Sequence, residues 1–199
     1  MEEKPASWIK KEGVCTITMN SPKTLNALSS GLTAALEEAF EDCFDESIRA
    51  VVLTGSGKAF CAGGDLQGML EIGAPKWLQQ VPKKLSVVIS AIRELPKPVI
   101  AAVNGPAMGV GMSVAMACDL RVASEKASFV QSYTSVGLSP DGAWSLTVPR
   151  IIGLSKAMEM LLLDTPVNAE EALRLGMVSK VFTLESFAEE TEKLAKKLA

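Results

Sequence analysis

The stretch PVIAAVNGPAMGVGMSVAMACD, from Pro98 to Asp119, decides how the rest of the chain is organised. Its apolar run at 99–103 predicts a buried strand, which Asn104-Gly105-Pro106 then breaks. A glycine-containing turn follows, and the apolar residues 112–118 predict a helix. Since the first four N–H groups of a helix lack partners within it, such a turn can hold an anion or a developing oxyanion. Taken alone, the stretch is better explained as a plain strand-turn-helix packing unit.

A second glycine turn lies upstream of the first. Residues 50–54 predict a compact buried strand, and the segment AFCAGGDL from Ala59 leads into a short helix predicted from Asp65. Gly63 and Gly64 suit a tight turn with positive φ, which by itself is weak evidence for function. Two such turns in one chain favour a functional site over simple packing.

Composition sets the broad class of the protein. The 199 residues are 48% hydrophobic and carry a net charge of −3, which suits one core of ordinary size and gives no nucleic-acid footprint. No uninterrupted apolar run is long enough for a membrane span. The N-terminus lacks the pattern of a secretion signal, so we expect a cytoplasmic protein, or a peroxisomal or mitochondrial one if the source is eukaryotic.

The reactive residue types limit the possible chemistry. The sequence contains no histidine, which excludes Ser–His–Asp and Cys–His devices and removes histidine as a metal ligand or general base. Its four scattered cysteines form no CxxC pair and predict reduced thiols rather than disulfides or a zinc site. Catalysis would have to come from carboxylates, other side chains, backbone dipoles or a cofactor.

The fold expected from the residues is an α/β body with a helical C-terminal part, because strand and helix signals alternate only to about residue 130. Beyond this pattern, the chain resembles the crotonase superfamily, the enoyl-CoA hydratase/isomerase family, in five segments that occur in order. The segments are NSPKTLNALS from Asn20, GKAFCAGGDL from Gly57, KPVIAAVNGPAMGVGMSVAMACDLRVAS from Lys97, VGLSPDGAWSLTVPRIIG from Val136 and NAEEALRLGMVSKVF from Asn168.

The resemblance implies an architecture and a ligand. Residues 1–182 should form a crotonase-like spiral of β-β-α units with two roughly perpendicular sheets, which binds an acyl-CoA thioester. Residues 183–199 match the start of a C-terminal helical region through which family members usually continue, so we expect this region to be incomplete. A homotrimer or a dimer of trimers is implied in the same way. Coenzyme A enters only as part of the substrate, and no other cofactor or metal is expected.

The resemblance also implies site residues. It assigns an oxyanion hole to the backbone N–H groups of Gly64 and Val110, which would stabilise the thioester oxygen as it becomes an enolate oxygen. For Lys23, a solvated surface position is an equally good explanation. The channel for coenzyme A is assigned to Lys23, Leu25, Ala62, Gly63, Asp65 and Leu66.

Departures from the family pattern decide the expected activity. Family hydratases use two glutamates to hold and activate water, and Ser113 and Tyr133 occupy those positions here, which disfavours hydration. Asp141 matches the acidic position of Δ3,Δ2-enoyl-CoA isomerases. One carboxylate there can remove a proton from C2 and return it to C4, and burial would raise its pKa. The blander alternative is that Asp141 caps a helix predicted at 143–152.

The leading hypothesis is therefore an isomerase that converts 3-enoyl-CoA into trans-2-enoyl-CoA, as in fatty acid β-oxidation. One alternative is another family activity, on cyclic or aromatic-derived acyl-CoA, that uses the same aspartate; family dehalogenases also use histidine, which is missing here. A second alternative is a non-catalytic acyl-CoA-binding member, which would also lack both glutamates. Cys61, close to Gly64, is interpreted as a packing residue because no base accompanies it.

Overall fold

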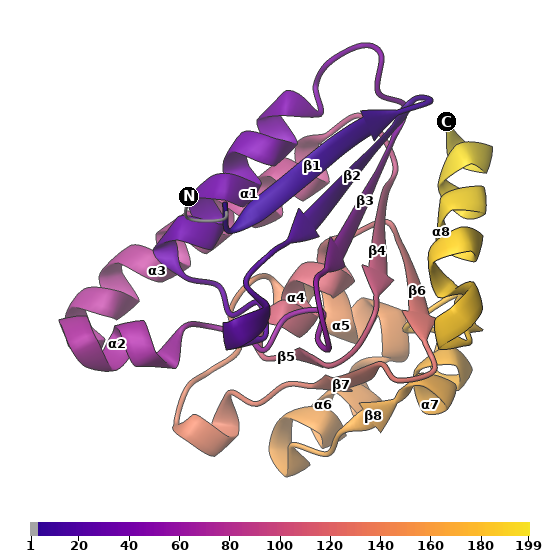
Figure 1. The fold of residues 1–199 in the computed structure, drawn as a ribbon. Coiled ribbons are helices and arrows are strands. Elements are labelled where there is room, and N and C mark those ends of the chain that lie inside the picture. The colour runs from indigo at the N-terminus through magenta and orange to yellow at the C-terminus, as the bar shows by residue number, and fades with distance from the viewer. Residues whose placement is uncertain (1–3) are drawn as a thin grey trace.

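Six strands form the larger of two sheets (Figure 1). The computed structural model describes residues 4–199, apart from the side chains at positions 74, 78 and 80–82. β1 and β2 are antiparallel, and the remaining neighbours are parallel. In order across the sheet the strands are β1 (Ala6–Lys11), β2 (Val14–Met19), β3 (Ala50–Gly55), β4 (Val99–Val103), β6 (Leu120–Ser124) and β9 (Lys180–Phe182).

A smaller sheet runs across the ends of these strands (Figure 1). Its ladder is continued by two isolated bridges, one between Leu28 and Gly64 and one between Cys61 and Ala107. Each turn of the chain thus places one strand in the large sheet and one short pairing in the small sheet before a helix returns it. This is the predicted spiral of β-β-α units. The named strands of the small sheet are β5 (Ala107–Met108), β7 (Ser128–Val130) and β8 (Val167–Asn168).

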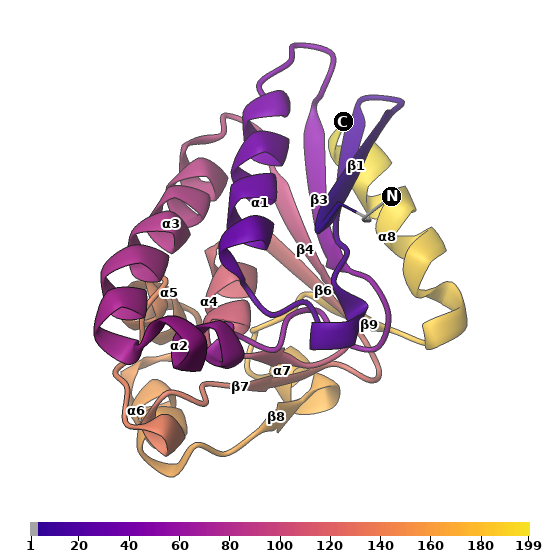
Figure 2. The same ribbon diagram turned by 60° about the vertical axis from the view of Figure 1, so that its left-hand side comes forward.

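Helices cover both faces of the large sheet. In Figure 2, α1 (Ser30–Asp42), α3 (Ala74–Glu94) and α4 (Val110–Ala117) lie on one face, and α8 (Leu184–Leu198) lies on the other. This double cover explains why β4 is buried along its whole length and reads as a continuous apolar run. The other helices are α2 (Leu66–Ile72), α5 (Trp144–Ile152), α6 (Leu154–Leu163), α7 (Ala169–Arg174) and the 3-10 turns η1 (Pro22–Thr24) and η2 (Thr134–Val136).

The fold confirms the α/β class expected from the sequence. The strand predicted at 99–103 has those bounds, whereas α4 begins at Val110, earlier than the predicted residue 112. This shift matters because it places Val110 in the first turn of the helix, where N–H groups lack helical partners. Within residues 4–199, none of the helices combines the length and the apolar character needed to cross a bilayer.

One buried amide fastens the loop that follows β2. Asn26 is 0% exposed, and its Oδ1 accepts a hydrogen bond from the N–H of Ser21 at 2.9 Å. Its Nδ2 donates to the carbonyl oxygens of Ser56 at 3.0 Å and Ala59 at 2.9 Å. The side chain therefore joins the loop at 20–28 to the loop that leads from β3 into the small sheet.

Replacement Asn26→Ala should lower the free energy of unfolding by about 3 kcal/mol, because buried backbone groups lose their partner. Urea denaturation followed by circular dichroism measures this loss. The matched control is Thr24→Ala, which removes an exposed hydroxyl bonded to the Ser21 carbonyl and should cost less than about 0.5 kcal/mol. Equal urea midpoints for the two variants would contradict the role given to Asn26.

Candidate active site

The two glycine turns found in the sequence lie against each other. Gly63 has φ +103° and Gly109 has φ +52°, both in the region that favours glycine. A methyl group placed on Gly109 would lie 3.8 Å from Cα of Gly63, and the N–H of Met108 donates to the carbonyl of Cys61 at 2.9 Å. The turns that carry Gly64 and the start of α4 are therefore adjacent.

The N–H groups of Gly64 and Val110 are both unpaired in the described chain. Within residues 4–199, no backbone or side-chain acceptor takes a hydrogen bond from either of them. The N–H of Ser113 already has an acceptor, the carbonyl of Gly109 at 3.2 Å. Val110 begins α4, so its N–H lies at the positive end of the helix dipole, where a negative charge is stabilised. This placement supports the predicted oxyanion hole, whose role stays a prediction.

Close backbone contact holds the start of α4 against the other turn. A methyl group on Gly111 would lie 2.4 Å from the carbonyl oxygen of Cys61 and 2.7 Å from its Cβ. Only glycine permits this approach. Burial raises the pKa of the Cys61 thiol to about 12, so it stays protonated at neutral pH. The cysteine therefore packs rather than reacts, which agrees with its sequence interpretation.

Asp141 approaches the same helix from a separate segment. A methyl group on Gly142 would lie 2.8 Å from Cβ of Ser113 and 3.2 Å from Cγ2 of Val110. Gly142 and Ala143 both have positive φ, of 58° and 62°. For Ala143 this conformation is strained, and such strain persists where the surroundings impose it. The turn sets Asp141 beside the first turns of α4.

The Asp141 side chain does not cap α5. That helix begins at Trp144, and its N-cap residue Ala143 makes no capping bond through its side chain. The backbone carbonyl of Asp141 accepts from the N–H of Trp144 at 3.1 Å, while the carboxylate Oδ1 accepts from the Tyr133 hydroxyl at 2.7 Å. The N-cap alternative for Asp141 is therefore wrong, because its carboxylate accepts a hydrogen bond from Tyr133 and none from the N-terminus of α5.

The electrostatics of this carboxylate suit a proton acceptor. Burial raises the pKa of Asp141 above its usual range, and the hydrogen bond from Tyr133 opposes part of that rise. Burial also raises the pKa of Tyr133, so the phenol keeps its proton and acts as a donor. A base with a raised pKa is better matched to work near neutral pH.

The structure brings some of the residues predicted to line a coenzyme A channel close together. Lys23 and Asp65 border one hollow of about 610 Å³, and the carbonyl of Leu25 accepts from the N–H of Ala62 at 2.9 Å. Asp65 also caps α2, since its Oδ1 accepts from the N–H of Gly68. The hollow is lined by Asn20, Ser21, Pro22, Lys23, Thr24, Ala27, Ser29 and Asp65.

The other channel residues differ in exposure. Leu25 and Leu66 are 44% and 43% exposed, like several other leucines on the surface of this chain, so their exposure alone does not indicate a ligand. Gly63 is buried, and its carbonyl accepts from the N–H of Leu28 at 2.7 Å. It therefore shapes the turn and pairs with the neighbouring loop. Their assignment to a coenzyme A channel stays a prediction.

Sequence reasoning missed one residue at the site. Trp77, in α3, is 6% exposed, and its ring atoms Cη2 and Cζ2 would lie 3.2 and 3.3 Å from a methyl group on Gly64. The glycine thus leaves room for an indole ring beside the free N–H. No spacing in the sequence signals this, because the contact depends on how α2 and α3 fold back over the turn.

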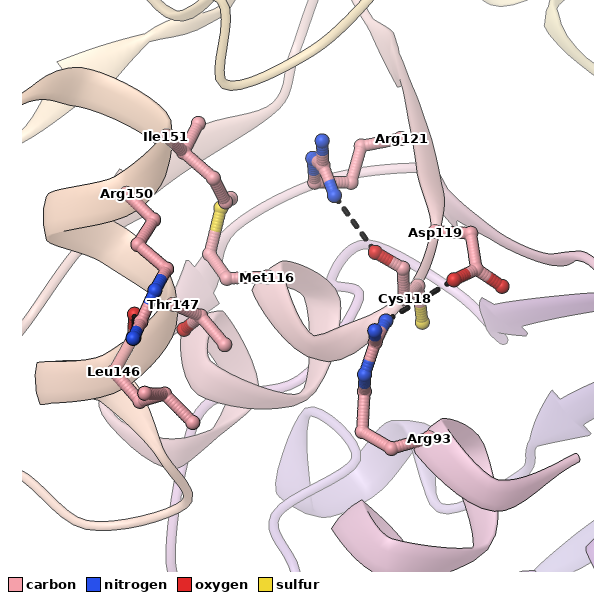
Figure 3. Close-up of a pocket in the computed structure, with 9 residues that line it drawn as sticks. All are labelled: Arg93, Met116, Cys118, Asp119, Arg121, Leu146, Thr147, Arg150 and Ile151. Carbon is pink, nitrogen blue, oxygen red and sulfur yellow. Dashed lines mark hydrogen bonds and ion pairs between the residues drawn. The ribbon is translucent and has the colours of Figure 1, made fainter.

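A second hollow, of about 560 Å³, lies at the opposite end of α4 (Figure 3). Two of the three arginines that line it bind that helix end, and the third, Arg150, donates to the carbonyl of Leu146 in α5 at 2.7 Å. Arg121 donates to the carbonyl of Cys118 at 2.7 Å and Arg93 donates to Ala117 at 3.2 Å. Arg93 also pairs with Asp119 at 3.0 Å. Because these donors satisfy carbonyls at a helix C-terminus, the cluster is explained by structure alone.

Comparison with known proteins places the chain in a family. The family model described as Enoyl-CoA hydratase/isomerase matches residues 9–199. The chain belongs to the enoyl-CoA hydratase/isomerase family. The free N–H pair and the carboxylate beside it thus lie within the region that defines the family. The match covers both glycine turns and the segment that carries Asp141.

Similar proteins carry different names within the enoyl-CoA hydratase/isomerase family. The 1,2-epoxyphenylacetyl-CoA isomerase of Escherichia coli (strain K12) is 36% identical over 95% of this chain and 74% of its own length. A probable enoyl-CoA hydratase of Rhodobacter capsulatus is 39% identical over 84% of this chain and 64% of its own length. The crystal structure of an enoyl-CoA hydratase from Bacillus anthracis matches with a TM-score of 0.94 and 31% identity, over 98% of this chain and 76% of that one. The chain thus spans about two thirds to three quarters of these proteins, of which one is named an isomerase and two are named hydratases.

Replacement Gly111→Ala should destabilise the protein by about 1–3 kcal/mol and separate the two turns, because its methyl group would overlap the carbonyl of Cys61. Thermal unfolding measures the loss. Gly31→Ala is the matched control, since the nearest atoms to its methyl group lie at 3.9 and 4.0 Å and alanine favours the helix. A neutral or stabilising effect at both positions would show that the close contact at Gly111 is not required.

Proposed function

We propose that this chain carries the site of an acyl-CoA isomerase that shifts a double bond from 3-enoyl-CoA to trans-2-enoyl-CoA. The observation that supports this most is the single carboxylate of Asp141 beside two free N–H groups, at Gly64 and Val110. The positions that carry two glutamates in family hydratases hold Ser113 and Tyr133 here. A site with one base and an oxyanion hole suits proton transfer better than hydration.

The proposed reaction is a proton transfer in two steps. The Asp141 carboxylate accepts the proton from C2 of the bound 3-enoyl thioester, and the electron pair moves onto the thioester oxygen. The N–H groups of Gly64 and Val110 donate to that oxygen, which stabilises the dienolate. The carboxylic acid then returns the proton to C4 as the double bond forms between C2 and C3. Atoms and charge balance without any added cofactor.

Binding of the substrate and assembly are part of the proposal. Lys23 lies exposed beside Asp65 in the hollow of about 610 Å³, where its charge could pair with phosphates of coenzyme A. Leu25 and Leu66 would cover the pantetheine arm. A homotrimer or dimer of trimers, and a cytoplasmic location, are proposed on the resemblance to the family and on the sequence.

A second candidate activity is isomerisation of a cyclic or epoxide acyl-CoA. It is favoured by the similarity to the Escherichia coli protein named 1,2-epoxyphenylacetyl-CoA isomerase. The same carboxylate and oxyanion hole could serve such a substrate. Turnover of a panel of thioesters separates the candidates, since use of cyclic or epoxide substrates without linear 3-enoyl-CoA would favour the second.

Replacement Asp141→Asn should lower kcat/KM for 3-enoyl-CoA by on the order of 10²–10⁴-fold with unchanged stability, because the amide cannot accept the proton. The absorbance of the conjugated product measures the rate. In the unmodified protein, kcat/KM should rise with pH through the raised pKa of Asp141, since only the ionised form is a base.

The Asn substitution has a control and a contrary result. Asp45→Asn, at an exposed position outside the proposed site, keeps a side-chain acceptor for the N–H of Ser47 and should leave kcat/KM unchanged. Full activity in Asp141→Asn would contradict the assignment of Asp141 as the catalytic base. Tight binding of an acyl-CoA without exchange of its α-proton in D₂O would instead identify a non-catalytic member.

A further inference from the structure

Three polar groups meet behind the proposed base. The Tyr133 hydroxyl lies 2.7 Å from Oδ1 of Asp141 and 2.9 Å from Oγ of Ser113. The Ser113 hydroxyl also lies 3.1 Å from the backbone carbonyl oxygen of Asp141. Ser113 is 0% exposed and Tyr133 is 6% exposed, so water competes little for these bonds. The three residues come from α4, the segment before η2 and the segment before α5.

Counting protons fixes the direction of these bonds. A tyrosine hydroxyl carries one proton, and an ionised carboxylate can only accept. The bond between Tyr133 and Asp141 therefore uses the phenol proton. The Ser113 proton is then directed to the Tyr133 oxygen or to the Asp141 carbonyl. In either case the serine holds the tyrosine or the backbone of the aspartate in place.

We propose that Tyr133 is a positioning residue for the Asp141 carboxylate, and that Ser113 anchors Tyr133 in that role. This inference rests on the proposed function for its consequence, but the bond itself is a property of the folded chain. With Oδ1 engaged by the phenol, Oδ2 is the oxygen left to carry the substrate proton. To move a proton from C2 to C4 on the same side of the dienolate, the carboxylate must present one oxygen in a fixed orientation.

The backbone around Tyr133 is itself held rigidly. Gln131 is 1% exposed, and its Oε1 accepts from the N–H of Tyr133 at 3.0 Å. Its Nε2 donates to the hydroxyl of Thr134 at 2.6 Å. Ser132, at φ +49°, donates its N–H to Oδ1 of Asp164 at 2.8 Å. A positioning residue needs such support, because a loose phenol would not hold the carboxylate.

The groups that face Asp141 make this bond measurable. From the segment before η2 comes Tyr133, the titratable neighbour that influences the carboxyl, and from α4 comes the neutral Ser113. Leu85, from α3, packs near Gly142 and carries no charge. Removal of the phenol hydroxyl should therefore raise the pKa of the Asp141 carboxyl further, because its ionised form loses a donor.

The test compares wild type with Tyr133→Phe, which keeps the ring and removes the hydroxyl. We expect the Asp141 carboxyl, followed by ¹³C NMR and assigned with Asp141→Asn, to titrate at higher pH. The acid limb of kcat/KM should move the same way, with a loss on the order of tenfold at its low-pH end. Ser113→Ala should shift both in the same direction by less. Ser135→Ala, which removes an exposed hydroxyl bonded to Ser132, should shift neither.

A second experiment changes the acidity of the Tyr133 phenol without removing any group, so it does not depend on whether Tyr133→Phe folds. Tyr133 is the only tyrosine of the sequence, so labelling with 3-fluorotyrosine alters this phenol alone. The more acidic phenol donates more strongly and should lower the pKa of the Asp141 carboxyl. An unchanged titration in both Tyr133→Phe and the fluorinated protein would overturn the inference, even if kcat/KM fell. A shifted titration without turnover of any acyl-CoA would support the inference and reject the proposed function.

Discussion

Direct backbone contact between two turns is the constraint on which this site depends. Gly111 lies so close to Cys61 that no side chain fits between them, and Gly63 and Gly109 meet in conformations that favour glycine. Because the contact is made by backbone atoms, it does not vary with side-chain rotamers. Two N–H groups that the fold leaves unpaired are thereby fixed relative to each other. Hydrogen-bond donors that need no rearrangement are the kind that best stabilise a developing oxyanion.

The β-β-α spiral brings the two glycine turns, which are separate in the sequence, into contact. Pairing in the small sheet, through Leu28 with Gly64 and Cys61 with Ala107, aligns successive turns of the chain at the same edge. The continuous apolar run at 99–103 predicted β4 with its observed bounds, because that strand is buried along its whole length. A pattern of this kind could not reveal β5, which is two residues long and pairs only after folding. The assembly of the site therefore depends on pairings that have almost no local signature.

The candidate base shows the same division between sequence and structure. Resemblance singled out Asp141, and helix capping was a fair rival because the sequence places it just before a predicted helix. The rival was wrong because Gly142 and Ala143, both at positive φ, separate the carboxylate from α5. Tyr133 lies eight residues before Asp141, but η2 and an irregular segment separate them, so no helix or strand spacing predicts their hydrogen bond. The resemblance singled out Asp141, Ser113 and Tyr133, and the structure shows the hydrogen bonds between them.

The arginine cluster beyond α4 has a consequence for the site at the other end of that helix. All eight residues of α4 are buried, so the charge separation along its backbone is poorly screened by solvent. Arg121 and Arg93 neutralise the negative pole through the carbonyls of Cys118 and Ala117. The positive pole at Val110 has no such counterpart within the described chain. The partial positive charge at the Val110 end of α4 is therefore less neutralised than the partial negative charge at the other end, a polarity that would favour an anion beside Gly64.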